Sequence, residues 1–280
     1  MTEKLSELSL EQYYSAIKNQ DSTILNKDLF QSKPQYISEE LMRSTFEIVK
    51  GVVEVIGTNW FEADPTLLCL IAHLNTVQTR ICLDVPERIK IKDLITCSTI
   101  GEICIRCVDY ADFLEDDKAT ILAKAVRDTA CYIFEFWGEA KEQGVAIEPE
   151  VHLVLYRFVC VFLTIGGSQL LNTSILNKCS NSLLEVCQQA ICNNDSSTAY
   201  LLLPYLNQLP TLTVDTIHLI VEFVMKQFPD GNWHDAVEDA LECIEKLKFR
   251  VDWYSAQTLL AARSKLDFLP DKRLIDILDM

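Results

Sequence analysis

Residues 64–83, which read DPTLLCLIAHLNTVQTRICL, contain the clearest fold signal in the chain. Asp64 is a residue type that caps helix N-termini, and Pro65 occupies the first helical position, where its missing N–H leaves no bond unmade. Apolar residues then recur every three or four positions, as on one face of a helix: Leu67, Leu70, Ile71, Leu74, Val77 and Ile81. The stretch predicts a helix with this face buried, running to about Leu83 and ending before Pro86.

Similar start and stop signals divide the rest of the chain. Gly57, Gly144 and Gly166 follow apolar-periodic runs, and Gly144 is expected to be the left-handed residue after a helix. The remaining helices are predicted over residues 38–56, 92–114, 117–143, 149–165, 174–192, 197–208, 213–228, 232–248, 252–265 and 270–280, with a short one near residues 9–17. No segment alternates like a strand without also fitting a helix. The predicted fold class is all-α, with about 12 helices.

The helices recur with a regular spacing. Their starts lie about 20 to 27 residues apart, so consecutive pairs repeat at roughly the 40 to 47 residues of HEAT or armadillo units. Over residues 38–265 the chain resembles the armadillo/HEAT class, which implies a right-handed α-solenoid of stacked helical hairpins. The importin-type signature, a Trp with an Asn four residues later, is absent at all four tryptophans, so the resemblance does not extend to binding nuclear-import signals. A compact, irregular helical domain is the structural alternative.

The two ends of the chain are expected to differ from the repeats. Residues 1–37 carry Tyr13, Tyr14 and Ile17 on a short amphipathic segment, which fits either an N-terminal cap or a detachable arm. Residues 266–280 are expected to form a C-terminal capping helix. The predicted domains are therefore 1–37, 38–265 and 266–280.

Charge and cysteine usage limit the partners and the compartment. Among 280 residues, Lys and Arg number 25 and Asp and Glu 41, a net charge of −16 that disfavours nucleic acids and anionic membranes. The N-terminus lacks a secretory signal, and 11 cysteines without one indicate a reducing compartment, cytoplasmic or nuclear. No run looks long enough to cross a bilayer; the richest, residues 151–165, is interrupted by polar residues and is interpreted as a buried helix.

The sequence contains few motifs of the kind that form catalytic or metal-binding sites. The chain lacks a phosphate-binding Gly-rich loop, a nucleophile elbow and an HExxH pair. Cys104 and Cys107 have a metal-like spacing but lie in mid-helix, so core packing is the simpler explanation; a mixed site with Cys69 and His73 is the alternative. The four histidines are interpreted as structural. We expect no catalytic residue, no cofactor and no metal.

Two groups of residues are candidate partner contacts. Phe136 and Trp137 lie on two faces of the long helix over residues 117–143, where they either pack against flanking helices or line a groove. The second group is a one-sign stripe aligned by helical spacing, which is either a solvated face or a docking ridge for a basic segment: Asp235, Glu238, Asp239, Glu242 and Glu245.

These features favour a non-catalytic protein–protein interaction scaffold or adaptor, which binds a helical or extended, basic segment of a partner within a larger complex. One alternative is a helical regulator of a small GTPase or other switch protein, which would need an exposed arginine; the candidates are Arg106, Arg127, Arg157 and Arg263. The other is an enzyme with dispersed residues, which would need a polar pocket holding His152 or His218 beside a cysteine.

Overall fold

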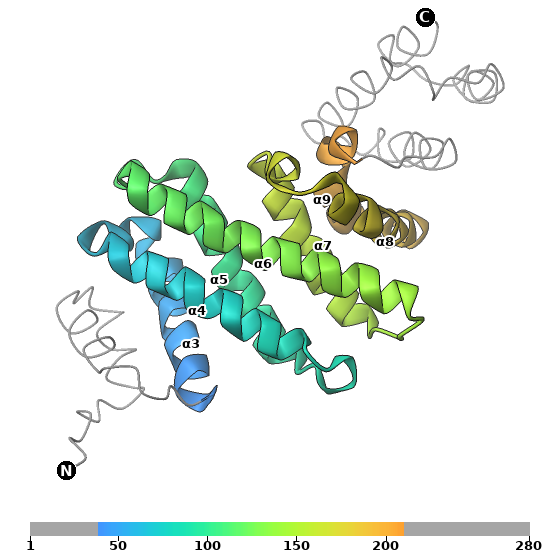
Figure 1. Cartoon of the computed structure of the whole chain (residues 1–280), viewed down its shortest axis with the longest axis horizontal. Helices are drawn as coiled ribbons and strands as arrows, with labels where there is room; N and C mark the ends of the chain where they lie inside the picture. The colour runs from blue at the N-terminus through green and yellow to red at the C-terminus, as the bar shows by residue number, and fades with distance from the viewer. Residues whose placement is uncertain (1–38, 210–280) are drawn as a thin grey trace, which may run out of the picture. The chain divides into compact units, whose positions relative to one another are not determined.

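The structure, a computed structural model, describes residues 39–209, and every regular element within that range is a helix (Figure 1). The α-helices are α3 (Glu39–Ile56), α4 (Pro65–Leu83), α5 (Ile91–Tyr110), α6 (Asp116–Glu142), α7 (Pro149–Thr164), α8 (Thr173–Cys192) and α9 (Ser196–Leu202). The 3-10 helices are η1 (Thr58–Ala63), η2 (Pro86–Arg88), η3 (Gly167–Leu170) and η4 (Leu203–Gln208). The predicted all-α class is confirmed. The end segments 1–37 and 266–280 and the helices expected after residue 209 lie outside the described residues, and the total of about 12 helices stays a prediction.

The helix ends follow the predicted signals closely. The Asp64 carboxylate accepts hydrogen bonds from the backbone N–H groups of Thr66 and Leu67, both at 3.1 Å, and so caps α4. Gly144 and Gly166 have left-handed φ angles of +67° and +70° after α6 and α7. The predicted helix over residues 197–208 is wrong in its second half. Pro204 has no N–H to donate, and the chain continues there as the 3-10 helix η4.

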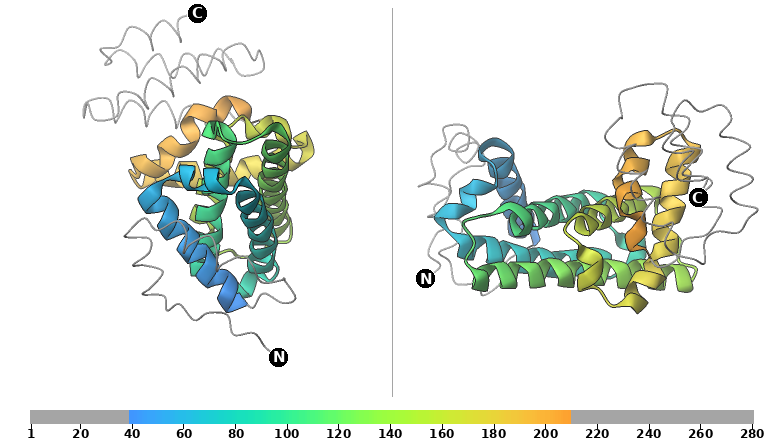
Figure 2. Two further views of the ribbon diagram at one scale, coloured as in Figure 1. Left: turned by 90° about the vertical axis from the view of Figure 1, so that its left-hand side faces the viewer. Right: turned by 90° about the horizontal axis from the view of Figure 1, so that it is seen from above.

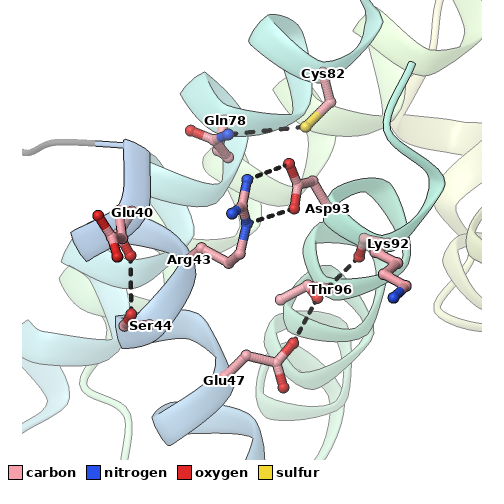
Figure 3. Close-up of polar contacts among 9 residues, drawn as sticks. All are labelled: Glu40, Arg43, Ser44, Glu47, Gln78, Cys82, Lys92, Asp93 and Thr96. Atoms are coloured by element: carbon pink, nitrogen blue, oxygen red, sulfur yellow. Dashed lines mark hydrogen bonds and ion pairs between the residues drawn. The ribbon is translucent and has the colours of Figure 1, made fainter. Parts of the chain in front are cut away.

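The chain divides into two compact units at Ala130–Cys131, within α6. In the first unit, α3 packs alongside α5 and runs in the same direction (Figure 3). Arg43 of α3 donates two hydrogen bonds to the Asp93 carboxylate of α5, at 2.6 and 2.8 Å. One turn further along, the Thr96 hydroxyl donates to Glu47 at 2.8 Å. These contacts fix the register of the two helices.

Helices α4 and α6 form a second parallel pair, and they lie side by side in Figures 1 and 2. At one end of the pair, Lys118 of α6 donates to the Thr66 hydroxyl at 2.6 Å. Further along, the Thr76 hydroxyl lies 2.8 Å from that of Thr129 and 3.2 Å from the carbonyl oxygen of Ala125. Both threonines are buried, so the interface between the two helices contains a hydrogen-bonded polar centre.

The face that α4 buries differs from the prediction. Three residues expected in the core, Leu70, Val77 and Ile81, are 44%, 54% and 59% exposed. Polar residues are buried instead, on the sides that meet α5 and α6: Asn75, Thr76, Gln78 and Thr79. Leu67 and Ile71 of the predicted face are buried as expected, but Leu68 and Leu83, which lie off that face, are buried too, so periodicity alone could not identify the whole buried side. The Thr76 hydroxyl also bonds the Ala72 carbonyl, so its burial leaves no unpaired group.

Helix α4 also corrects the expectation about membrane-spanning runs. Among the described helices, Pro65–Leu83 is long and apolar enough to cross a bilayer by length and composition alone, with a mean hydropathy of 1.2. However, 56% of that window is buried inside the protein. This burial matches a core helix with one face left open.

In the second unit, α7 runs parallel to α9 and η4. The Tyr156 hydroxyl of α7 donates to the Thr198 carbonyl oxygen at 3.0 Å. Near the other end of α7, the Gln208 amide of η4 donates to the Leu163 carbonyl oxygen at 3.2 Å and accepts from the Ser168 hydroxyl at 2.6 Å. Helix α8 packs against both α7 and α9.

The bidentate Arg43–Asp93 contact should contribute measurably to stability, because the Asp93 side chain is only 10% exposed. We expect Asp93→Asn to lower the free energy of unfolding by about 1 to 2 kcal/mol, since it weakens two charge-assisted hydrogen bonds. Urea denaturation followed by circular dichroism measures the change. Asp128→Asn is the matched control: Asp128 pairs with its exposed neighbour Arg127, and we expect a loss below about 0.5 kcal/mol. Equal losses in the two variants would contradict this prediction.

Candidate binding pocket

A cavity of about 300 Å³ lies in the second unit, between α7, α8 and the start of α9. Helix α8 contributes a stripe at three- and four-residue spacing, in which polar and apolar residues are mixed: Ser182, Glu185, Val186, Gln189, Ala190 and, just after the helix, Asn193. Pro149, His152 and Leu153 line it from α7, and Asp195 and Thr198 from α9. The lining contains two carboxylates and no lysine or arginine.

The corner between α8 and α9 brings polar groups to the edge of this cavity. Asn194 adopts a left-handed φ of +57°, the N–H of Asn194 bonds the Ile191 carbonyl, and the N–H of Asp195 bonds that of Ala190. This pair of hydrogen bonds is a Schellman motif, in which a single left-handed residue terminates the helix. Asp195 then caps α9, since its Oδ1 accepts from the Thr198 N–H at 3.2 Å and from the Ser197 hydroxyl at 2.7 Å. These hydrogen bonds hold the pKa of the Asp195 carboxyl below its usual range.

On the other side of the cavity, His152 is held by Trp137. The indole Nε1–H of Trp137 donates to His152 Nδ1 at 2.9 Å, and the two ring centroids lie 5.7 Å apart. Because an indole nitrogen can only donate, Nδ1 must carry the lone pair and Nε2 the proton. Burial lowers the pKa of His152; the charge of Glu185 opposes this shift, and the charge of Lys141 adds a smaller lowering. A proton added at Nδ1 would also break the bond from Trp137.

One ion pair lies beside the cavity. Lys141, at the end of α6, donates to Glu185 Oε1 at 2.5 Å. Both side chains are exposed, at 41% and 64%, so the pair is screened by solvent. Lys141 therefore offsets part of the charge of Glu185 through its Oε1.

The candidate contact residues have mixed outcomes. Trp137 is fully buried and presents no surface, so only Phe136, which is half-buried, is still available as an aromatic contact. The acidic stripe, Asp235 to Glu245, lies outside the described residues. Among the candidate arginines, Arg106 and Arg157 are exposed and Arg127 bonds Asp128, whereas Arg263 lies outside the described range.

The cysteines behave as core residues. Cys104 and Cys107 are both 1% exposed, and burial raises the pKa of Cys107 to about 12 and that of Cys104 still higher. Within residues 39–209, no group of three or more Cys, His, Asp or Glu residues could hold a metal ion. The cavity contains His152, but no cysteine lines it, so the combination that the dispersed-enzyme hypothesis required is not found there.

Sequence reasoning missed most of the cavity. His152 was interpreted as a structural histidine, and its bond to Trp137 agrees with that, but its position at a cavity was not foreseen. Glu185 and Asp195 come from separate helices and were not singled out. The available signal was the polar spacing along α8 together with an Asn-Asn-Asp sequence at its end, which is typical of a helix stop followed by an N-cap.

No family model, curated protein or solved structure matches the chain.

The lowered pKa of His152 has a consequence for stability. In the unfolded chain a histidine titrates near 6.5, so below that pH the unfolded state binds a proton that the folded state resists. The free energy of unfolding should therefore fall as the pH drops from about 7 to 5. His152→Asn should reduce this fall, because an Asn carbonyl can still accept from Trp137 but does not titrate. Urea denaturation at several pH values measures how the free energy of unfolding changes with pH in the wild type and the variant.

His73→Asn is the control for that experiment, since His73 lies exposed on α4. Its pH profile should follow the wild type. A His152→Asn profile that is as steep as the wild type would show that the acid sensitivity arises elsewhere.

Proposed function

We propose that this chain is a non-catalytic interaction scaffold or adaptor that binds a basic, helical or extended segment of a partner protein within a larger complex. The observation that carries the proposal is the open apolar face of α4. An apolar row in water costs free energy, and a contiguous one usually marks a contact surface. The rest of the support comes from the helix packing and from the charge.

The apolar row of α4 comprises Leu70, Leu74, Val77 and Ile81. Its members lie at i, i+4, i+7 and i+11, so they align along one side of the helix. Leu70, Val77 and Ile81 are exposed and Leu74 is half-buried. Ile121, on the adjacent helix α6, is 43% exposed. A row with this spacing suits the apolar side of an amphipathic partner helix, which uses the same repeat for its own anchors.

The order of helix packing supports a solenoid as the architecture for this role. Residues in contact between α3 and α5, and between α4 and α6, are separated by 49 to 53 positions. Between α7 and α9 with η4 the separations are 42 and 45. Each pair is parallel, as expected for stacked hairpins; the separations of 42 and 45 fall within the 40 to 47 residues of HEAT or armadillo units, whereas those of 49 to 53 are somewhat longer. Stacked hairpins of this kind offer extended surfaces to partner segments.

Charge favours a basic partner. The chain has a net charge of −16, so it attracts cationic segments over distances of about one Debye length and repels anionic ones. We expect the association to combine apolar contact at α4 with an electrostatic contribution that weakens as salt is added.

The apolar row can be tested with a matched pair of double variants. Val77→Gln/Ile81→Gln should reduce capture of the partner by about tenfold or more, since each exposed side chain loses on the order of 1 kcal/mol of contact. Val55→Gln/Ile95→Gln is the control, because these residues are similarly exposed, at 57% and 44%, on α3 and α5. Quantitative affinity purification of the full chain, with mass spectrometry, compares both with the wild type.

Thermal denaturation of the variants shows whether each is folded; we expect little change, because the substituted side chains are already in water. If both double variants retain wild-type capture, the row on α4 is not the contact surface.

A further inference from the structure

The cavity between α7, α8 and α9 has the chemistry of a receptor for one cationic side chain. Two carboxylates line it, from different elements, and its lining has no lysine or arginine. Asp195 accepts through Oδ1 from the Thr198 N–H and the Ser197 hydroxyl, and the Thr198 side chain also bonds this carboxylate. Glu185 gives one oxygen to Lys141, and its other oxygen can accept as well. A cation that enters would meet two acceptors, and an anion would be repelled.

A second, independent feature points to a ligand at the same place. Ser182 lines the cavity and is only 3% exposed, yet within the part of the chain that the structure describes its hydroxyl makes no hydrogen bond. Neighbouring Ser180, in contrast, donates to the Leu176 carbonyl at 2.6 Å. The Ser182 hydroxyl is not one of the fully buried polar atoms that lack a partner in the described residues, so it is open to the cavity, where a guanidinium could donate a hydrogen bond to its oxygen.

The other lining residues favour an arginine side chain over other cations. Leu153, Val186 and Ala190 give the cavity apolar walls, which suit an aliphatic stem. Several acceptors at different positions suit a flat guanidinium with five N–H donors better than a compact ammonium group. A volume of about 300 Å³ is at the lower end for ligand pockets and fits a single side chain rather than a helix.

We propose that this cavity binds an arginine side chain of the partner segment, with the guanidinium between Glu185 and Asp195 and the stem against Leu153 and Val186. The proposal rests on the proposed function, since it assigns an anchoring position to the basic partner. His152 closes one side of the cavity as a neutral ring, because Trp137 occupies its Nδ1. The charge of the lining comes from Glu185 and Asp195, and Lys141 offsets part of that of Glu185.

The test uses the full chain and three capped tripeptides, acetyl-Gly-X-Gly-amide, in which X is arginine, citrulline or lysine. Citrulline keeps the shape of arginine and lacks its charge. Titrations are followed by NMR through the indole N–H signal of Trp137, assigned by its loss in Trp137→Phe, because this group contacts His152 at the cavity. We expect saturable shifts with millimolar affinity for arginine, and at least tenfold weaker binding of citrulline.

Two variants with a matched control complete the test. Glu185→Gln/Asp195→Asn should weaken arginine binding at least tenfold; Glu185 is exposed, and asparagine also caps helices, so this variant should fold. Ser182→Ala should weaken binding severalfold. Glu135→Gln, at an exposed position of α6, removes the same kind of charge away from the cavity and should bind arginine as the wild type does.

Each other outcome contradicts the proposal in a defined way. Absence of shifts, or equal shifts with citrulline, overturns the cation site, and equal affinity for lysine overturns the preference for guanidinium. Suppose Glu185→Gln/Asp195→Asn no longer binds the arginine peptide but still captures the partner in the affinity purification. The proposal that the partner anchors an arginine in this cavity is then wrong, and the proposed scaffold function stands. If Val77→Gln/Ile81→Gln captures the partner as well as the wild type does, while the arginine peptide binds normally, the proposed contact face on α4 is wrong and the arginine site stands.

Discussion

The buried indole N–H of Trp137 is paired with His152, and in the second unit this bond fixes one side of the cavity. Trp137 is fully buried at the end of α6, so an unpaired Nε1–H would be unfavourable by about 1 to 3 kcal/mol. His152, on the first turn of α7, supplies the acceptor. The bond ties α7 to α6, selects the histidine tautomer and keeps the imidazole uncharged. The charge of the cavity comes from Glu185 and Asp195, beside this neutral side.

Local signals in the sequence were sufficient for most helix boundaries. Asp64 with Pro65, Gly144 and Gly166 act through their own backbone and side-chain chemistry, which needs no tertiary structure. The all-α class was therefore predictable. The break at Pro204 was predictable too, because a proline in a helix interior has no N–H to donate.

Burial was harder to predict than helix formation. Helix α4 has apolar residues on more than one side, and the polar groups of Thr76 and Thr129 satisfy each other only once α4 and α6 are paired. Periodicity along one helix contains no information about that partner. The same limit applies to the cavity, since Glu185 and Asp195 converge only through the tight turn at Asn194. Ser182, His152 and Asp195 are far apart in sequence and could not be grouped from spacing alone.

The packing of the thiols makes most of the described cysteines chemically inert. Burial raises the pKa of Cys187 to about 12 and that of Cys179 well above its usual range, so almost no thiolate, the reactive form, is present at neutral pH. Of the ten cysteines in the described part of the chain, Cys192 is the one that is exposed. It follows Ile191 at the last position of α8, next to Asn193 on the cavity lining. A maleimide fluorophore would thus attach preferentially at this position among those ten, and would place a spectroscopic reporter one residue from the cavity lining without any engineered thiol there.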